Sequence, residues 1–362
     1  MILNKHKLYR TLKTLDTFVN KSLGLEYMGP NLCGFHYNYD LLKAAAYNTY
    51  LETVGTRADS IYAAIKRAKL SDIYLEYLKT VEIVGQKIDL SSHDAVFAFD
   101  YTNEDFYGKL ENIWIHGWTG ENAVTGKFKF LTCALVSGDI PQKIPLLSIP
   151  IHLGNNLAKD VLFCLSLVRP LVKSISVILF DRGFYSKDLM MTLNRSRYPY
   201  LIFVPKNDMV KRELEGMAED EKRWFHYEFE LNKDKTVLKG ETTMAFLKKV
   251  IDPSNGKRLD WPFATNVGTI DLDHIVQIYK GRWRIETGFR VQDEARISSK
   301  SKDIRPRFFL FVYEQLLQLL WVVLYKEEVP FKRFLIEISE LCEYRLREWE
   351  DRMRCQSSDI KV

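Results

Sequence analysis

The sequence predicts an α/β protein: a mixed sheet flanked by helices, with an N-terminal helical domain and a β-rich insertion. Three observations predict this class. Residues 1–90 place apolar side chains three or four positions apart, as amphipathic helices do. From residue 94, short apolar runs follow one another, separated by Gly, Pro and Asn. Strand and helix patterns then alternate, which indicates that part of the sheet is parallel.

Composition limits the class further. The chain has 362 residues, of which 46% are hydrophobic and 27% charged, so it is neither a disordered chain nor a collagen. Its length suggests about two domains. The five cysteines include no Cys-x-x-Cys pair, which fits a reducing cytoplasm better than a disulfide framework. The N-terminal residues lack the long apolar core of a signal peptide, and we expect a cytoplasmic protein.

Residues 1–90 predict a helical N-terminal domain. We favour a DNA-binding role for it, and a packing or dimerisation module is the alternative. The core begins with the strand DAVFAFD, which ends at Asp100, and three further strands follow between residues 112 and 153. Residues 155–173 then predict a helix, and SISVILFD predicts a strand that ends at Asp181. A helix in SKDLMMTLNRS and a strand in YLIFVPK complete this part of the sheet.

The composition and the hydrophobic pattern of the chain change after residue 205. Residues 206–260 are charge-dense with short alternating runs, which predict a β-rich insertion. WPFATN resembles one more core strand, and residues 271–297 predict one long helix capped by Asp271. We therefore expect a mixed α/β core over residues 91–205 and 261–325, and a helical tail over residues 326–362.

Residues 308–325 are apolar enough to be mistaken for a membrane span. They contain Glu314, Gln315 and Gln318, and polar groups are costly in lipid. We expect a helix buried in a protein core and no membrane association.

Two aspartates follow strands. Carboxylates at the ends of strands in a mixed sheet are well placed for catalysis or for binding hard cations such as magnesium and manganese. Asp100 and Asp181 both have this position. An aspartate at a strand end is also common as a turn or capping residue.

A charged segment of the late helix supplies a third carboxylate. Tyr279, Arg282, Glu286, Arg290 and Asp293 follow one another at intervals of three or four, which predicts that they share one helix face. Residues 280–307 contain nine Lys or Arg and four Asp or Glu, so this segment alone has a charge of +5, as the whole chain does. Such a basic segment with aromatic residues suits a phosphate backbone. A solvated ladder of salt bridges is the plainer alternative.

The spacing Tyr279-x2-Arg282-x3-Glu286 resembles the signature around the catalytic glutamate of DDE transposases from prokaryotic insertion sequences. DRGFYS at residues 181–186 resembles the second-aspartate motif of that family, and FDYTNEDFYG at 99–108 resembles its first-aspartate segment. The resemblance covers about residues 90–325. The best-known branch has Lys seven positions after the glutamate, where this chain has Asp293. Arg290, four positions after the glutamate, instead fits the archaeal-type branch of the insertion-sequence-four-like superfamily.

This resemblance implies a ribonuclease-H-like fold in which Asp100, Asp181 and Glu286 are catalytic and hold two Mg²⁺ or Mn²⁺ ions. The implied reactions are cleavage at transposon ends and transfer of the freed 3′-OH into target DNA. Tyr279, Arg282 and Arg290 are the expected DNA-binding residues. The implied partner is double-stranded DNA, bound by a homodimer that associates with the nucleoid.

Two other functions stay open on the sequence alone. A metal-dependent nuclease of the same fold would use the same carboxylates to cut DNA without joining it. A catalytically inactive DNA-binding protein derived from a transposase would keep the basic segment.

Overall fold

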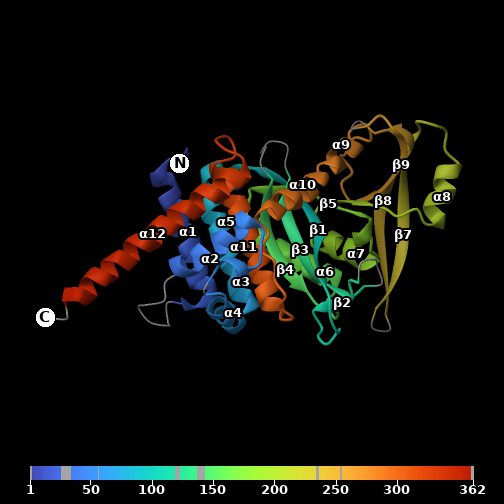
Figure 1. Ribbon diagram of the computed structural model, residues 1–362. Coiled ribbons are helices and arrows are strands. Elements are labelled where there is room, and N and C mark those ends of the chain that lie inside the picture. The colour runs from blue at the N-terminus through green and yellow to red at the C-terminus, as the bar shows by residue number, and fades with distance from the viewer. Residues whose placement is uncertain are drawn as a thin grey trace. The chain divides into compact units, whose positions relative to one another are not determined.

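Figure 1 shows the computed structural model of the chain, which describes residues 2–25, 34–55, 57–118, 123–136, 143–233, 236–252 and 255–359. The chain divides into two compact units. Unit 1 comprises residues 1–88, 147–150 and 288–362, and unit 2 comprises residues 89–146 and 151–287.

Unit 1 consists mainly of helices. They are α1 (Lys5–Leu23), α2 (Gly34–Tyr47), α3 (Leu51–Val54), α4 (Ala58–Arg67), α5 (Leu70–Gly85), α11 (Ile304–Leu324) and α12 (Phe331–Asp359), with short 3₁₀ turns at Gln86–Ile88 and Asp293–Ala295. Helix α1 begins where the Asn4 side chain accepts hydrogen bonds from the amides of His6 and Lys7, at 2.9 and 3.1 Å. It ends at Gly24, whose φ of 62° is a left-handed conformation that glycine adopts easily.

Helix α11 is the centre of unit 1. It packs against α4 and α5, and Phe309 stacks on Phe18 of α1 with ring centroids 5.9 Å apart. Among the described helices it alone is long and apolar enough to cross a membrane, but 89% of its apolar window is buried in the structure. The prediction of a buried core helix is confirmed. Because α11 packs against N-terminal helices, residues 288–325 group with residues 1–88 in unit 1.

Unit 2 is built on a mixed, mostly antiparallel sheet. Its strands are β1 (Asp94–Phe106), β2 (Ile115–Gly117), β3 (Gly126–Leu135), β5 (Ser174–Phe180), β6 (Tyr200–Phe203), β7 (Lys222–Lys233), β8 (Thr236–Ile251) and β9 (Arg258–Thr265). They lie in the order β2-β3-β1-β5-β6-β9-β8-β7. Strand β4 (Ile144–Ile151), whose first residues belong to unit 2, pairs with β3 off this path.

Helices and short turns connect these strands. They are α6 (Leu157–Val168), α7 (Lys187–Arg195), α8 (Asp208–Glu215), α9 (Ile275–Lys280) and α10 (Trp283–Gln292), whose last residues belong to unit 1, with 3₁₀ turns at Leu90–Ser92, Arg169–Leu171 and Arg182–Phe184. Helix α7 packs against α6 and against strands β7 and β8.

The parallel portion that the sequence predicts lies at β1, β5 and β6. Strand β5 runs parallel to both neighbours, whereas β1 pairs with β3 and β6 pairs with β9 in antiparallel fashion. The ladder between β1 and β5 contains a bulge. Ala95 pairs with Ile175 and the next residue, Val96, pairs with Val177, so the exposed Ser176 is one extra residue in β5.

The segment 206–260 begins with α8, which the prediction of a β-rich insertion did not include. It continues as the long antiparallel hairpin of β7 and β8, and β9 begins within it. Strand β8 pairs with β9, so the hairpin extends the same sheet at one edge (Figure 1).

The prediction of one long helix over residues 271–297 is wrong. The structure has two helices, α9 and α10, with Gly281 and Arg282 between them. Glycine is a poor helix former, and a Cβ at position 281 would lie only 3.0 Å from the carbonyl oxygen of Ile278. Asp271 does not cap α9 directly, because its carboxylate accepts hydrogen bonds from the Asp273 amide and the His274 ring.

Candidate active site

Asp100 and Asp181 lie at neighbouring positions of the parallel strands. Phe99 pairs with Phe180 in the β1–β5 ladder, and the two buried rings stack at 5.4 Å. Side chains alternate along a strand, so the next residues, Asp100 and Asp181, both point to the other face of the sheet. The backbone of Asp181 is still extended, with φ −79° and ψ 177°. The two carboxylates predicted from the sequence therefore emerge side by side.

The sequence predicted that both aspartates lie at the ends of strands, and this is true of Asp181 but not of Asp100. Strand β5 ends before Asp181, whose Oδ1 accepts a hydrogen bond of 2.8 Å from the Gly183 amide. Strand β1 does not end at Asp100. It continues to Phe106 because residues 101–106 pair with β3, and Asp100 itself pairs with Thr132.

Arg282 joins Asp100 to Glu286. Its Nη1 lies 3.0 Å from Asp100 Oδ2, and its Nη2 lies 2.5 Å from Glu286 Oε1. The Arg282 side chain is buried, whereas the Glu286 side chain is 42% exposed. The other oxygen of Asp100 accepts the Tyr101 amide at 2.8 Å. The guanidinium thus holds two of the predicted catalytic carboxylates around one buried positive charge.

The electrostatics of Asp100 link all three predicted carboxylates. Burial raises the pKa of Asp100 to about 6, although Arg282 and the Tyr101 amide lower it. The negative charges of Asp181 and Glu286 both raise that pKa further. Each of these carboxylates is therefore close enough to affect the ionisation of Asp100.

Tyr279 lies in an aromatic cluster. Its ring stacks on Phe203 at 5.6 Å, lies 5.0 Å from Phe263 and meets the edge of Trp261 at 6.5 Å, and the residue is only 4% exposed. Burial raises the pKa of its hydroxyl to about 12. The Arg282 guanidinium lies 5.9 Å from the ring centre. With its faces covered, the ring contributes packing beside Arg282 and is not available to stack on a base.

The predicted single face of five residues is therefore interrupted. Tyr279 belongs to α9, Glu286 and Arg290 belong to α10, and Asp293 lies in a 3₁₀ turn. The Arg290 side chain is exposed. The break at Gly281 and Arg282 is what separates these positions, and the structure brings together only Tyr279, Arg282 and Glu286.

The donor set suits a hard divalent cation. Three carboxylates offer only oxygen ligands, which Mg²⁺ and Mn²⁺ prefer. Over the described part of the chain, no three His, Cys, Asp or Glu side chains are already arranged to hold a metal ion. At this site the positive group that lies against Asp100 and Glu286 is the Arg282 guanidinium.

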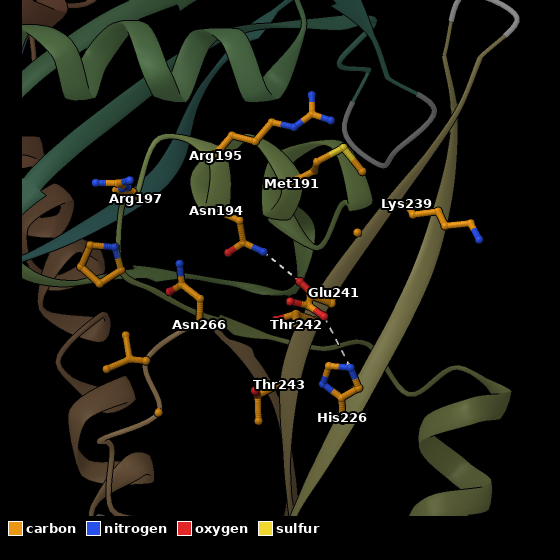
Figure 2. A pocket seen from close by; sticks show the side chains of 14 residues that line it. Met191, Asn194, Arg195, Arg197, His226, Lys239, Glu241, Thr242, Thr243 and Asn266 are labelled. Carbon is orange, nitrogen blue, oxygen red and sulfur yellow. Dashed lines mark hydrogen bonds and ion pairs between the residues drawn. The ribbon is translucent and has the colours of Figure 1, made fainter.

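A second feature of unit 2 is a cavity of about 830 Å³ lined by residues of α7, β7 and β8 and by the turns that precede β6 and follow β9 (Figure 2). Arg195 and Arg197 line it. They were not among the predicted site residues, and the only sequence signal for them is the basic pair in NRSRY at the end of α7.

The fold and the site together define an α/β protein in which an arginine joins a carboxylate of the sheet to one of helix α10, with a third carboxylate on the neighbouring strand. Residues 147–318 match the family model of the transposase DDE domain, a region that includes Asp181 and Glu286 and begins after Asp100. The match spans just under half of the chain.

The fold is also similar to that of a solved transposase. The structure of the piggyBac transposase synaptic complex with hairpin DNA aligns with a TM-score of 0.55 and 12% identity, covering 94% of this chain and 81% of that one. Comparison with curated proteins gives no significant match. Both the matched domain and the solved structure of similar fold are those of transposases. DDE transposases generally use divalent metal ions.

Proposed function

We propose that the chain is a DNA transposase of ribonuclease-H-like fold that cleaves transposon ends and transfers the freed 3′-OH into target DNA. The observation that carries the proposal is the electrostatic grouping of Asp181 and Glu286 around Asp100, with Arg282 bound to two of the three. The order of elements also supports it, because antiparallel leading strands precede a helix and a parallel strand that ends directly before the second aspartate.

Asp100, Asp181 and Glu286 are the residues that would hold two Mg²⁺ or Mn²⁺ ions. Such ions, when bound, favour attack on a phosphodiester and stabilise the oxygen that leaves. Asp100 is the central residue of the three, because the negative charges of the other two carboxylates raise its pKa from different elements. The protein needs no covalent intermediate, since water attacks in the cleavage step and the DNA 3′-OH attacks in the transfer step.

Arg282 has two roles in this proposal. In the protein without metal it compensates the charges of Asp100 and Glu286. Once cations compensate these carboxylates, the guanidinium is free to bind a DNA phosphate, which it suits by its planar set of donors. Tyr279 positions Arg282 by packing beside it, and the exposed Arg290 supplies a further phosphate contact.

We assign the chain to the archaeal-type branch of the insertion-sequence-four-like superfamily, since Arg290 lies four positions after Glu286. A homodimer that bridges two transposon ends is the proposed working form, in the cytoplasm and on the nucleoid when DNA is bound. The catalytic core is proposed to span residues 91–205 and 261–325, with residues 1–90 available for DNA recognition.

The test is cleavage and joining of DNA that carries the ends of the element, with Mg²⁺ or Mn²⁺. Asp181→Asn should abolish both reactions and leave DNA binding intact, because the substitution removes one ligand charge and keeps the side-chain volume. Glu228→Gln is the matched control, since Glu228 is an exposed carboxylate of β7. Equal activity of Asp181→Asn and wild type would refute the site.

The same assay separates the alternatives. Cleavage without joining, measured on pre-cleaved ends, would identify a nuclease. Tight binding of the correct ends without any chemistry would identify an inactive DNA-binding protein.

A further inference from the structure

The cavity in Figure 2 lies at the end of the sheet opposite to the carboxylates. Pro199, which precedes β6, and Asn266, which follows β9, both line it. Strand β6 runs parallel to β5, and Asp181 follows the far end of β5. The register places Pro199 beside Val177, four residues before Asp181, which is about 13 Å along the strand. The cavity is therefore separate from the active site and belongs to the same unit.

Three cationic side chains surround this cavity. Arg195 comes from the end of α7, Arg197 from the following turn and Lys239 from β8, and all three are exposed. Figure 2 shows Asn194, Asn266 and Thr243 toward the middle of the view and the three cations around them. In the part of the chain that the structure describes, none of the three cations has an ion pair or a side-chain hydrogen bond. The one acidic residue in the lining, Glu241, faces His226 at 3.6 Å.

The turn that carries Arg197 is held in place. The φ angle of Arg197, 56°, lies in the left-handed region, which is unfavourable for residues other than glycine. Hydrogen bonds fix it: the Arg197 amide donates to Asn194 O at 3.1 Å, and Asn266 Nδ2 donates to Tyr198 O at 2.9 Å. Asn194 Nδ2 in turn donates to Glu241 O at 2.8 Å, which ties the end of α7 to β8. A strained position that supporting contacts hold in place is typical of binding sites.

The lining also indicates the class of ligand. All the residues that line the cavity are described, and none of them is Phe, Tyr or Trp. Base recognition by stacking needs such rings, whereas phosphate groups are bound by Arg and Lys. A volume of about 830 Å³ with charged edges suits several phosphates of a backbone better than an apolar ligand.

We propose that this cavity is a second DNA site that binds backbone phosphates of the duplex outside the region undergoing catalysis. The proposal rests on DNA being the substrate of the proposed function. The two sites belong to the same unit and are offset by about 13 Å along the strands, a component that about four base pairs of duplex span.

The experiment measures how DNA affinity depends on salt. Arg195→Gln, Arg197→Gln and Lys239→Gln are combined in one full-length variant, and binding of a 40-base-pair duplex is followed by fluorescence anisotropy in EDTA. Each lost phosphate contact lowers the slope of log K against log salt by about 0.9. We expect the slope of the triple variant to fall by about 2 to 3 and its affinity at low salt to fall at least about tenfold.

A matched control removes the same charge elsewhere. Lys109→Gln, Lys159→Gln and Lys211→Gln change three exposed lysines of unit 2 that do not line the cavity. The slope of log K against log salt for the control should differ from that of the wild type by less than about 0.9, the value of one phosphate contact. An equal loss in both variants would overturn the proposal, because the effect would then be one of total charge.

Two further outcomes are decisive. Binding of inorganic phosphate or of a nucleotide at the cavity, with duplex affinity unchanged in the triple variant, would overturn the proposal in favour of a small-anion site. Circular dichroism and thermal melting establish that the triple variant is folded. Cleavage by wild type on transposon ends is scored separately, so that failure of the second site and failure of the proposed function remain distinguishable.

Discussion

Arg282 lies 3.0 Å from Asp100, through its Nη1 and the carboxylate Oδ2, although the two residues are separated by 182 positions in the sequence. The same guanidinium binds Glu286. A buried arginine between two carboxylates compensates their charge, and removal of one partner leaves the others unpaired.

Arg282→Gln should make metal binding easier in the absence of DNA. Glutamine removes the positive charge that competes with a divalent ion for Asp100 and Glu286. Titration calorimetry with MnCl₂ should show tighter binding than in wild type, and Mn²⁺ should raise the melting temperature of the variant more than that of wild type. Arg284→Gln, which changes a neighbouring arginine bonded to the Val136 carbonyl, is the control. Weaker Mn²⁺ binding in Arg282→Gln would show that the arginine supports the metal site.

Tyr279 should act through packing. Tyr279→Phe keeps the ring against Phe203 and Phe263, so DNA affinity should change by less than about threefold, which is under 1 kcal/mol. Tyr279→Ala removes the ring from the cluster and should lower the free energy of unfolding by about 3–5 kcal/mol. Urea unfolding and anisotropy measure the two quantities. A large loss of DNA affinity in a stable Tyr279→Phe would instead assign the hydroxyl to DNA binding.

Glu337 should make the stability of unit 1 dependent on pH. Its buried carboxylate accepts hydrogen bonds from the amides of Ile2 and Leu3, at 2.9 and 2.8 Å, and from Arg333 at 2.7 Å. Burial alone would raise the pKa of Glu337, but the amides and Arg333 outweigh it and hold the pKa below its ordinary value. The stabilisation is therefore fully present above about pH 4.3, the ordinary glutamate pKa, and is lost as the pH falls through the lowered pKa.

Glu337→Gln tests this dependence. The side-chain nitrogen of the glutamine is a donor and cannot accept the hydrogen bonds from the two amides and Arg333. We expect a loss of about 2–3 kcal/mol in the free energy of unfolding at pH 7. Plotted against pH, the free energies of unfolding of variant and wild type should converge below about pH 4. Glu340→Gln, an exposed glutamate of α12, should change little. Parallel curves over the whole pH range would contradict the assignment.

Arg197→Gly and Arg197→Ala separate backbone strain from charge at the cavity. Both remove the cation, but only glycine adopts the left-handed φ of Arg197 at low cost. The glycine variant should therefore be more stable than the alanine variant by about 1 kcal/mol, measured by urea unfolding. DNA affinity should fall equally in both. The reverse order of stability would mean that the turn changes conformation when Arg197 is replaced.

Local patterns predicted most of the individual elements. The apolar runs that precede Asp100 and Asp181 do form neighbouring strands, and the apolar segment at 308–325 is a buried helix. The helix over 271–297 could not be predicted as two pieces, because the charge spacing continues through Gly281 while the backbone does not.

Contacts between distant parts of the chain could not be predicted from the sequence. Spacing suggested that Tyr279, Arg282 and Glu286 act together, but it could not show that Arg282 also binds Asp100 or that the Tyr279 ring is covered. The cavity depends on the pairing of β6 with β9 and β9 with β8, so its cations come from segments more than 40 positions apart.

The bulge at Ser176 decides on which side of the sheet the second aspartate emerges. In a regular ladder without the bulge, Val96 would face Ser176, Asp100 would face Phe180, and Asp181 would project from the opposite side. One extra residue in β5, four positions before the end of the strand, thus brings two carboxylates that are 81 positions apart in the chain to the same side of the sheet. A variant that lacks Ser176 would keep Ala95 opposite Ile175 and Val96 opposite Val177, and with them both acids on one side, whereas a ladder that retains Ser176 without the bulge would separate them.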